Sequence, residues 1–207
     1  MKIPALILAA GKSERMGNPK MLLRWGERTI LEHVIIHALE GGVEEVVVVT
    51  GSQAELVEEI VRKTSWTKPV TTVYNPYYHL GMLSSVQCGI KYLMSQSDAV
   101  LVALGDQPTV PSEVFRTLIN FFPECKKGIL IPKFRGKRGH PIVIHQRYFG
   151  FLLELDPVKD SLHQLTDAFS SDIFDLEVES PEILRDIDSP QDLQALHQEE
   201  KISGEGF

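Results

Sequence analysis

The fold is decided by the stretch LILAAGKSERMGNPK, Leu6–Lys20. It begins inside a continuous apolar run, Ile3–Ala9, which is typical of a strand buried on both faces of a parallel sheet. It then becomes a short loop with two glycines, a proline and four charged residues. A buried strand followed at once by such a loop predicts a ligand site at the carboxyl end of a parallel strand.

Other apolar runs rich in β-branched residues alternate with amphipathic stretches, which is the pattern of βα units stacked into a largely parallel sheet. We predict strands at Ile3–Ala9, Val46–Thr50, Val70–Tyr74, Ala99–Leu104, Gly128–Ile131, Ile142–Ile144 and Ile173–Val178. We predict helices capped by Thr29 and by Ser52, and others at Ser84–Met94, Ser112–Phe122, Ser161–Phe169 and Pro190–Glu199. The result is one α/β domain, residues 1–199, doubly wound around a mostly parallel sheet of about seven strands, with a flexible tail at 200–207.

Composition limits the kinds of protein that this chain can be. The 207 residues are 43% hydrophobic and 24% charged, which is enough apolar content for the core of an ordered domain. The net charge of -7 argues against a broad nucleic-acid surface, whereas two local basic clusters suit a small anionic ligand. Two distant cysteines indicate neither a disulfide framework nor a zinc site. No apolar segment approaches the roughly 20 residues of a membrane span, so we predict a cytoplasmic protein without membrane or nucleic-acid partners.

The loop after the first strand has neither the P-loop nor the dinucleotide-binding glycine spacing. The physical ingredients of an anion site are present nevertheless. The small-residue turn at 9–11 offers amide hydrogens, Gly11 allows a close approach of the backbone, and Arg15 and Lys20 supply positive charge. The alternative is an ordinary strand-to-helix loop with solvated charges.

Acidic residues at two places indicate a metal site. Asp106 ends an apolar strand in VALGDQP, Val102–Pro108, and Mg²⁺ needs only one or two protein carboxylates besides phosphates and water. Asp186 and Asp188 flank one apolar residue in RDIDSPQDL, so both face the same way in an extended segment. The alternatives are a turn or N-cap aspartate at 106 and a helix cap formed by Asp188 or Ser189.

The stretch NPYYHLGMLSSVQCGI, Asn75–Ile90, turns the chain after a strand and leads into a helix. Its backbone groups and hydroxyls suit the edge of a nucleobase, and the alternative is that Tyr77, Tyr78 and Met82 simply pack in the core or at its rim. The segment from Phe134 to Pro141 is predicted to leave the sheet and to carry its basic residues over the ligand crevice. We find no motif for a covalent nucleophile.

Taken in order, LAAGKSERMGNPK, the stretch from Asn75, LGDQP, RGHP and DIDSPQDL resemble the MobA-like nucleotidyltransferase family over nearly the whole chain, in particular its molybdenum cofactor cytidylyltransferases. The resemblance implies a Rossmann-like sheet of the nucleotide-diphospho-sugar transferase type. It also implies Mg²⁺-dependent transfer of a nucleoside monophosphate from CTP, or another NTP, to a phosphate acceptor of the molybdopterin type, with release of pyrophosphate. An apo-molybdoenzyme would be the recipient of the product. One departure from the family is Ser189, where Thr is common.

The resemblance also implies a role for each residue at a matching position. The implied catalytic residues are Lys20, Arg15 and Asp106. The implied metal ligands are Asp106 and Asp188, and the choice between Asp186 and Asp188 stays open. The residues implied to lie near the acceptor are Arg138, Gly139 and His140. The residues implied to bind the nucleotide are Ala9, Ala10, Gly11, Lys12, Ser13, Arg15, Lys20, Asn75, Gly81, Met82, Ser84, Ser85 and Asp106.

The resemblance favours CTP as the nucleotide. Relatives that attach GMP have Leu-Ala-Gly-Gly where this chain has Leu-Ala-Ala-Gly at 8–11, and the extra Cβ of Ala10 would crowd a purine. Two other functions stay open. One is transfer with GTP or to another phosphorylated acceptor, such as a sugar or polyol phosphate. The other is a non-catalytic carrier of the molybdenum cofactor, which would not need the metal site.

Overall fold

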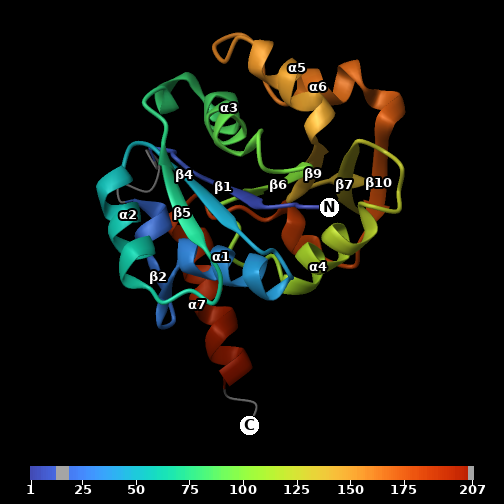
Figure 1. Cartoon of the computed structure of the whole chain (residues 1–207). Helices are drawn as coiled ribbons and strands as arrows, with labels where there is room; N and C mark the ends of the chain where they lie inside the picture. Colours follow the sequence, from blue (N-terminus) through green and yellow to red (C-terminus); the bar gives the residue numbers. More distant parts are fainter. Residues whose placement is uncertain (13–18, 205–207) are drawn as a thin grey trace.

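The computed structural model describes residues 1–12 and 19–204, and the side chains as far as residue 198. One sheet of eight strands forms the centre, in the order β10-β7-β9-β6-β1-β4-β5, with β8 paired to β7 (Figure 1). The strands are β1 Ala5–Ala9, β4 Val46–Thr50, β5 Val70–Tyr74, β6 Ala99–Leu104, β7 Ile129–Phe134, β8 Lys137–Arg138, β9 Ile142–His145 and β10 Ile173–Glu177. All neighbouring pairs are parallel except β6 with β9, β7 with β9 and β7 with β8. The predicted mostly parallel α/β sheet is confirmed.

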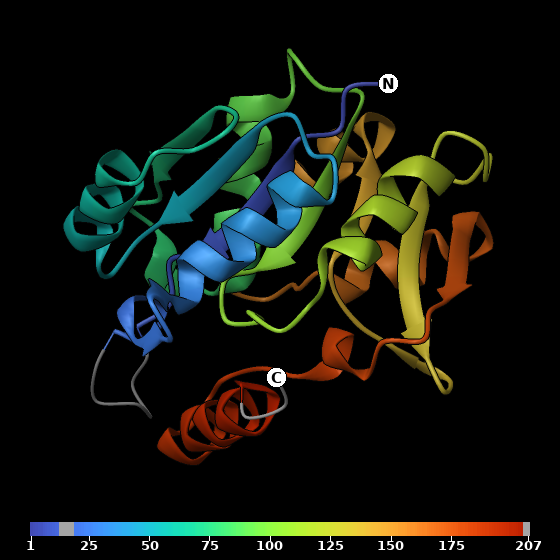
Figure 2. The ribbon, with the colours of Figure 1, turned by 90° about the horizontal axis from the view of Figure 1, so that it is seen from below.

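Helices cover both faces of this sheet because the side chains of each strand alternate between two cores. In β1, Ala5, Ile7 and Ala9 belong to one core, and Leu6 and Leu8 belong to the other. The first core is covered by α1 Ile30–Glu40, α2 Ala54–Lys63 and α4 Ser112–Phe121 (Figures 1 and 2). The second is covered by α3 Met82–Leu93, α5 Phe149–Glu154 and α6 His163–Ala168.

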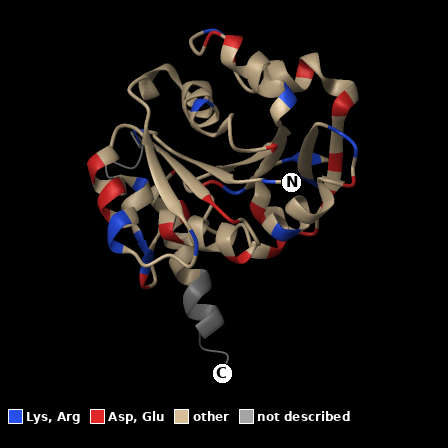
Figure 3. Cartoon of the chain, viewed as in Figure 1, with Lys and Arg blue, Asp and Glu red and all other residues tan. Residues whose placement is uncertain are grey.

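Charge follows the same layering. The central strands β1, β4 and β6 contain no charged residue, and the Lys, Arg, Asp and Glu side chains lie mainly on the helices and at the β7–β10 edge (Figure 3). Within the described part of the chain, no helix is long and apolar enough to cross a membrane.

The C-terminal helix α7, Pro190–Gly204, returns to the beginning of the chain. Leu196 packs with Ile30 and Ile187 in a small third core, which also contacts the hairpin formed by β2 Arg24–Trp25 and β3 Arg28–Thr29. This contact brings the segment before α7 beside the loops that follow β1 and β6. The predicted flexibility of residues 200–207 stays a prediction, and its last three residues lie outside the described ones.

The helix starts show one confirmed cap and one wrong cap. Thr29 caps α1 through a reciprocal capping box with Glu32, as predicted. The cap predicted at Ser52 is wrong, because α2 begins at Ala54 and its N-cap is Gln53, which makes no side-chain capping bond. The sequence pattern matched, but the chain enters the helix one residue later.

The excursion predicted from Phe134 to Pro141 is also wrong. β7 continues to Phe134, and Arg135 and Gly136, both at positive φ, turn the chain back so that β8 pairs with β7. This segment is therefore a hairpin at the edge of the sheet. Two successive residues at positive φ form a tight turn that favours pairing of the two flanking strands, and this turn keeps the segment in the sheet.

Candidate active site

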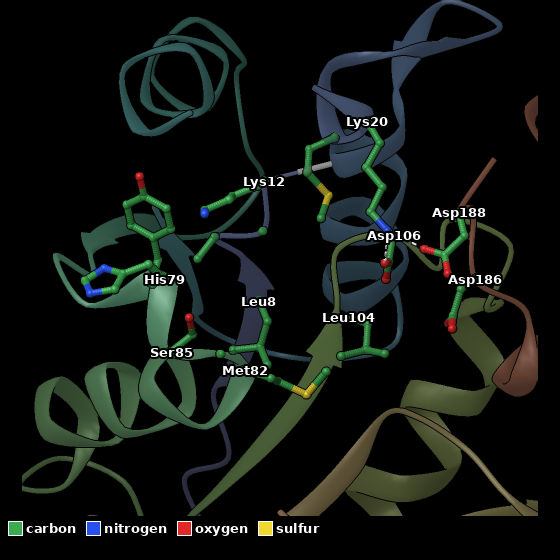
Figure 4. A pocket seen from close by; sticks show the side chains of 15 residues that line it. Leu8, Lys12, Lys20, His79, Met82, Ser85, Leu104, Asp106, Asp186 and Asp188 are labelled. Atoms are coloured by element: carbon green, nitrogen blue, oxygen red, sulfur yellow. Dashed lines mark hydrogen bonds and ion pairs between the residues drawn. The ribbon is translucent and has the colours of Figure 1, made fainter. Parts of the chain in front are cut away.

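A pocket of about 610 Å³ opens at the carboxyl ends of β1 and β6. Ligands are expected at this edge in open α/β sheets. Figure 4 shows Lys20, Asp106, Asp186 and Asp188 on one side of it and His79, Met82 and Ser85 on the other. The lining residues are Leu8, Ala10, Gly11, Lys12, Lys20, Met21, Tyr78, His79, Gly81, Met82, Ser85, Leu104, Asp106, Asp186 and Asp188. We call Lys20, Asp106, Asp186 and Asp188 the acidic wall, and Tyr78, His79, Gly81, Met82 and Ser85 the aromatic wall.

One ammonium joins two carboxylates in the acidic wall. Lys20 Nζ lies 2.5 Å from Asp106 Oδ2 and 2.8 Å from Asp188 Oδ1 (Figure 4). Burial alone lowers the pKa of Lys20, but the charge and hydrogen bond of Asp106, followed by those of Asp188, outweigh it, so this pKa lies above its ordinary value. Lys20 is therefore a cation at neutral pH. The two carboxylates define a position that attracts positive charge.

Asp188 reaches this position from an extended segment that precedes α7. The intervening Ile187 is fully buried, and its amide donates to the carbonyl oxygen of Asp106 at 2.9 Å. Asp186 and Asp188 both line the pocket. Ser189, rather than Asp188, caps α7. The side chains of Ser189 and Asp192 accept hydrogen bonds from each other's backbone amides at the start of this helix. A pocket carboxylate and a helix cap thus occupy adjacent residues.

The chemistry of these donors fits a divalent cation. Asp106 and Asp188 both bind one charged ammonium, and Mg²⁺ commonly takes one or two protein carboxylates and completes its shell with phosphates and water. In the described chain, no group of three or more His, Cys, Asp or Glu side chains has the arrangement of a metal site. A cation at this place would therefore depend on substrate oxygens for most of its ligands.

The residues of the aromatic wall lie close together in the sequence, at 78–85, on both sides of Gly81. Gly81 has φ +106°, a conformation that favours glycine, and it stands between a short 3₁₀ turn and the first residue of α3. Tyr78 and His79 lie in that turn, and their rings meet edge to face at 5.9 Å. The turn therefore brings two adjacent aromatic residues to the pocket, and Tyr78 also packs against the second core.

Two residues predicted to bind the base lie behind this wall instead. Asn75 is buried, and its amide donates to Ser84 Oγ at 2.9 Å and to Ser85 Oγ at 3.1 Å. The Ser84 hydroxyl is 2.8 Å from the carbonyl oxygens of Tyr77 and Gly81. Only Ser85 of these two serines lines the pocket. Asn75 and Ser84 therefore brace the turn, and Ser85 offers its hydroxyl to a ligand.

The first residues after β1 line the pocket between the two walls. Ala10, Gly11 and Lys12 line it, whereas Ala9 does not. The Ala10 carbonyl accepts from the Ser52 amide at 3.2 Å, which ties this loop to the end of β4. Two of the predicted residues, Ser13 and Arg15, fall outside the part of the chain that the structure describes.

The three residues predicted near the acceptor do not line the pocket. Arg138 pairs with Asp175 of β10 at 2.7 Å, on the outer side of the sheet edge. Gly139 is buried against the backbone of Ile183, which a Cβ would approach to 2.3 Å. The amide of His140 donates to the Ile183 carbonyl at 3.1 Å. Burial lowers the pKa of His140, and the charge of Asp106 acts in the opposite direction. Gly139 and His140 therefore support the segment behind the acidic wall, and Arg138 joins β8 to β10.

Sequence reasoning did not single out several lining residues, among them Leu8, Met21, His79 and Leu104. Leu8 and Leu104 occupy the ends of adjacent strands, so strand pairing could have placed them together. No strand pairing or motif in the sequence indicates that Met21 lines the pocket. Its sulfur would be 3.0 Å from a Cβ on Gly105, so glycine at that position gives it room.

The comparison with known families gives the enzyme class, a nucleotidyltransferase, and the pocket lies where such a sheet is expected to bind its ligands. The chain belongs to the family described as the MobA-like NTP transferase domain, whose model matches residues 5–171. It is 31% identical over 191 residues to the molybdenum cofactor cytidylyltransferase of Escherichia coli K12, a match that covers 92% of this chain and 93% of that protein.

Solved structures share the fold. Rv0371c from Mycobacterium tuberculosis H37Rv has a TM-score of 0.79 and 24% identity, over 96% of this chain and 98% of that one. The same protein has also been solved as a complex with manganese, with a TM-score of 0.75, 23% identity and coverage of 96% and 99%. A nucleotidyl transferase from Methanothermobacter, Mth528, has a TM-score of 0.79 and 24% identity over 98% of this chain and 99% of that one.

Proposed function

We propose that this protein transfers CMP from CTP to the phosphate of molybdopterin or of the molybdenum cofactor and releases pyrophosphate. The observation that carries the proposal is that Asp106 and Asp188 bind the same ammonium in a pocket that residues 10–12, after β1, also line. The identity to the Escherichia coli cytidylyltransferase supports the nucleotide and the acceptor. In this proposal the enzyme acts in the cytoplasm and passes its product to an apo-molybdoenzyme.

The chain needs no covalent nucleophile for this reaction. The acceptor phosphate attacks the α-phosphorus of CTP as pyrophosphate leaves, so the protein must align two anions that repel each other. Asp106 and Asp188 would hold Mg²⁺, which neutralises phosphate charge when it is bound. Lys20 would exchange its carboxylate partners for oxygens of the triphosphate, together with Arg15, and offset charge on the leaving group.

The remaining residues would position the two substrates. The loop 10–13 offers amide groups to the triphosphate, and Gly81, Met82 and Ser85 face the base and ribose. Arg138, Gly139 and His140 keep the acceptor role that the family resemblance gives them. Gly139 and His140 lie behind the acidic wall and Arg138 lies on β8 beside β10, so all three would act on the acceptor from outside the present pocket lining.

Base choice in this proposal depends on Ala10. Ala10 lines the pocket and is 5% exposed, with its Cβ packed beside Gly51, and in this proposal its presence in place of glycine would crowd a larger purine. We therefore expect Ala10→Gly to improve incorporation of GTP relative to CTP. A steric group of this size typically discriminates by about tenfold or more.

The test incubates the purified protein with Mg²⁺, molybdopterin-type cofactor and α-phosphate-labelled CTP or GTP in parallel. We expect label in the pterin product and pyrophosphate release with CTP. Equal incorporation from GTP would contradict the base assignment. Failure with both nucleotides, in a preparation that binds CTP, would favour another phosphorylated acceptor, such as a sugar or polyol phosphate, or a non-catalytic carrier of the cofactor.

A further inference from the structure

Gln107 is a buried side chain beside the acidic wall for which the reaction has no direct use. It follows Asp106, is 5% exposed and does not line the pocket. Its Nε2 donates to Asp186 Oδ1 at 2.7 Å and lies 3.4 Å from the Ile183 carbonyl oxygen. One amide group therefore connects the loop after β6 to a segment that lies 76 to 79 residues further along the chain.

A backbone hydrogen bond also joins the loop after β6 to the segment before α7. The amide of Ile187 donates to the carbonyl of Asp106 at 2.9 Å, and the Ile187 side chain is buried against Ile30 and Leu196. The residue after Ile187 is Asp188, whose carboxylate binds Lys20. The place of Asp188 opposite Asp106 thus depends on how the segment 183–187 is held.

The three carboxylates of the acidic wall differ in their partners. Asp106 and Asp188 each form an ion pair with Lys20, whereas Asp186 forms none with it among the described residues. Asp186 instead uses one oxygen to accept the Gln107 amide. Asp186 is exposed, whereas Gln107 is buried, and a buried amide donor without an acceptor is costly. The bond to Asp186 therefore satisfies the Gln107 amide and fixes the orientation of this carboxylate.

We propose that Gln107 and Asp186 are a positioning pair: Gln107 holds Asp186, and through it the segment that places Asp188 across from Asp106, while Asp186 itself is not a ligand of the cation. This inference rests on the proposed function, because it presupposes that Asp106 and Asp188 hold the metal. Residues that orient metal ligands typically change metal affinity by about 10–100-fold when they are replaced.

The experiment measures Mn²⁺ binding to the full chain in the presence of a CTP analogue that cannot release pyrophosphate, by the loss of the spin-resonance signal of free Mn²⁺, with the analogue alone as the blank. Gln107→Met keeps the length of the side chain and removes the donor. We expect it to weaken Mn²⁺ binding by about 10–100-fold, and Asp186→Ala to do the same. The double variant should bind no more weakly than either single variant, because both remove one interaction.

Asp186→Asn is the matched control, because it keeps the oxygen that Gln107 needs and removes the charge. We expect it to stay within about tenfold of the unaltered protein, above the affinity of Gln107→Met. A loss as large as that of Asp188→Asn would make Asp186 a cation ligand and overturn the inference. Unchanged affinity in Gln107→Met would overturn it as well.

Two further measurements separate this inference from its premise. If Asp106→Asn and Asp188→Asn both keep Mn²⁺ binding, the proposed metal site is wrong, and the inference falls with it. If both lose binding and Gln107→Met does not, only the positioning role is wrong. Circular dichroism checks each fold. Should Gln107→Met not fold, Gln107→Asn keeps the amide but is one methylene short of Asp186, and the same loss is expected.

Discussion

The two walls of the pocket are built in opposite ways. The acidic wall joins side chains that are far apart in sequence, since Lys20 binds Asp106 across 86 residues and Asp188 across 168. The aromatic wall comes from one turn and the first residues of α3, at 78–85. The acidic wall therefore depends on tertiary contacts behind it, and the aromatic wall depends on local hydrogen bonds. Substitutions in the two walls should therefore differ in their effects on turnover, cation binding and CTP binding.

The largest effect is expected in the acidic wall. Asp106→Asn keeps the shape of the side chain and removes the charge that binds a cation, so turnover should fall about a thousandfold, which corresponds to roughly 4 kcal/mol of lost charge stabilisation. The fold should persist, because the Asp106 carbonyl still accepts from Ile187. Steady-state kinetics and a thermal melt check both statements. Near-normal turnover would remove Asp106 from the mechanism.

The acidic wall also shows where sequence reasoning succeeds and where it stops. Buried strands such as VVVVT and AVLVAL were predicted at their observed bounds, because continuous β-branched runs have few alternatives. Asp106 was predicted as a site residue from its place at a strand end. Gln107 was not, because its partner lies 79 residues away and only packing brings the two together.

The short elements were missed for a different reason. β2 and β3 have two residues each and α5 has six, too few to show a periodic pattern. In the aromatic wall the motif pointed to residues of which Gly81, Met82 and Ser85 line the pocket, and their binding role stays a prediction. It could not tell Ser85 from Ser84, because the side of the turn that faces the pocket is set by the bonds of Asn75.

The second prediction concerns the ammonium within the acidic wall. Lys20 occupies the position that a divalent cation would take, so Lys20→Met should strengthen Mn²⁺ binding by about tenfold, because opposite charges a few Å apart interact by more than 1.4 kcal/mol. Arg24→Met removes the same charge from the exposed β2 and is the control. Titration of free Mn²⁺ measures both. Equal affinities in Lys20→Met and in the unaltered protein would mean that the two cations do not share one position.

A smaller effect is expected in the aromatic wall. Ser85→Ala removes a hydroxyl that lines the pocket, and Ser84→Ala removes one that only braces the turn. CTP binding, measured by calorimetry, should weaken about fivefold more in Ser85→Ala, the value of one hydrogen bond of about 1 kcal/mol. Ser84→Ala should lose more stability in urea, since the Ser84 hydroxyl also bonds the carbonyl oxygens of Tyr77 and Gly81, whereas Ser85→Ala removes only one acceptor of Asn75. The opposite order of CTP affinities would place Ser84 in the binding site.

The smallest effect is expected outside both walls, at Arg138. Its ion pair with Asp175 has side chains that are 44% and 31% exposed, and such pairs contribute less than about 1 kcal/mol. Arg138→Ala should therefore leave the unfolding free energy and the KM for CTP nearly unchanged. If the family resemblance locates the acceptor correctly, the KM for the acceptor should rise about fivefold, one charged hydrogen bond in an exposed setting.

Lys137→Ala is the matched control for that measurement, because it removes the same charge from the neighbouring position of β8, where the side chain faces the opposite way. A rise in acceptor KM for Arg138→Ala alone would extend the substrate path from the acidic wall to the edge of the sheet. Equal and small changes in both variants would leave Arg138 as an ion pair that joins β8 to β10. The acceptor would then have to be bound by the pocket itself, where Lys12 is the remaining described cation besides Lys20.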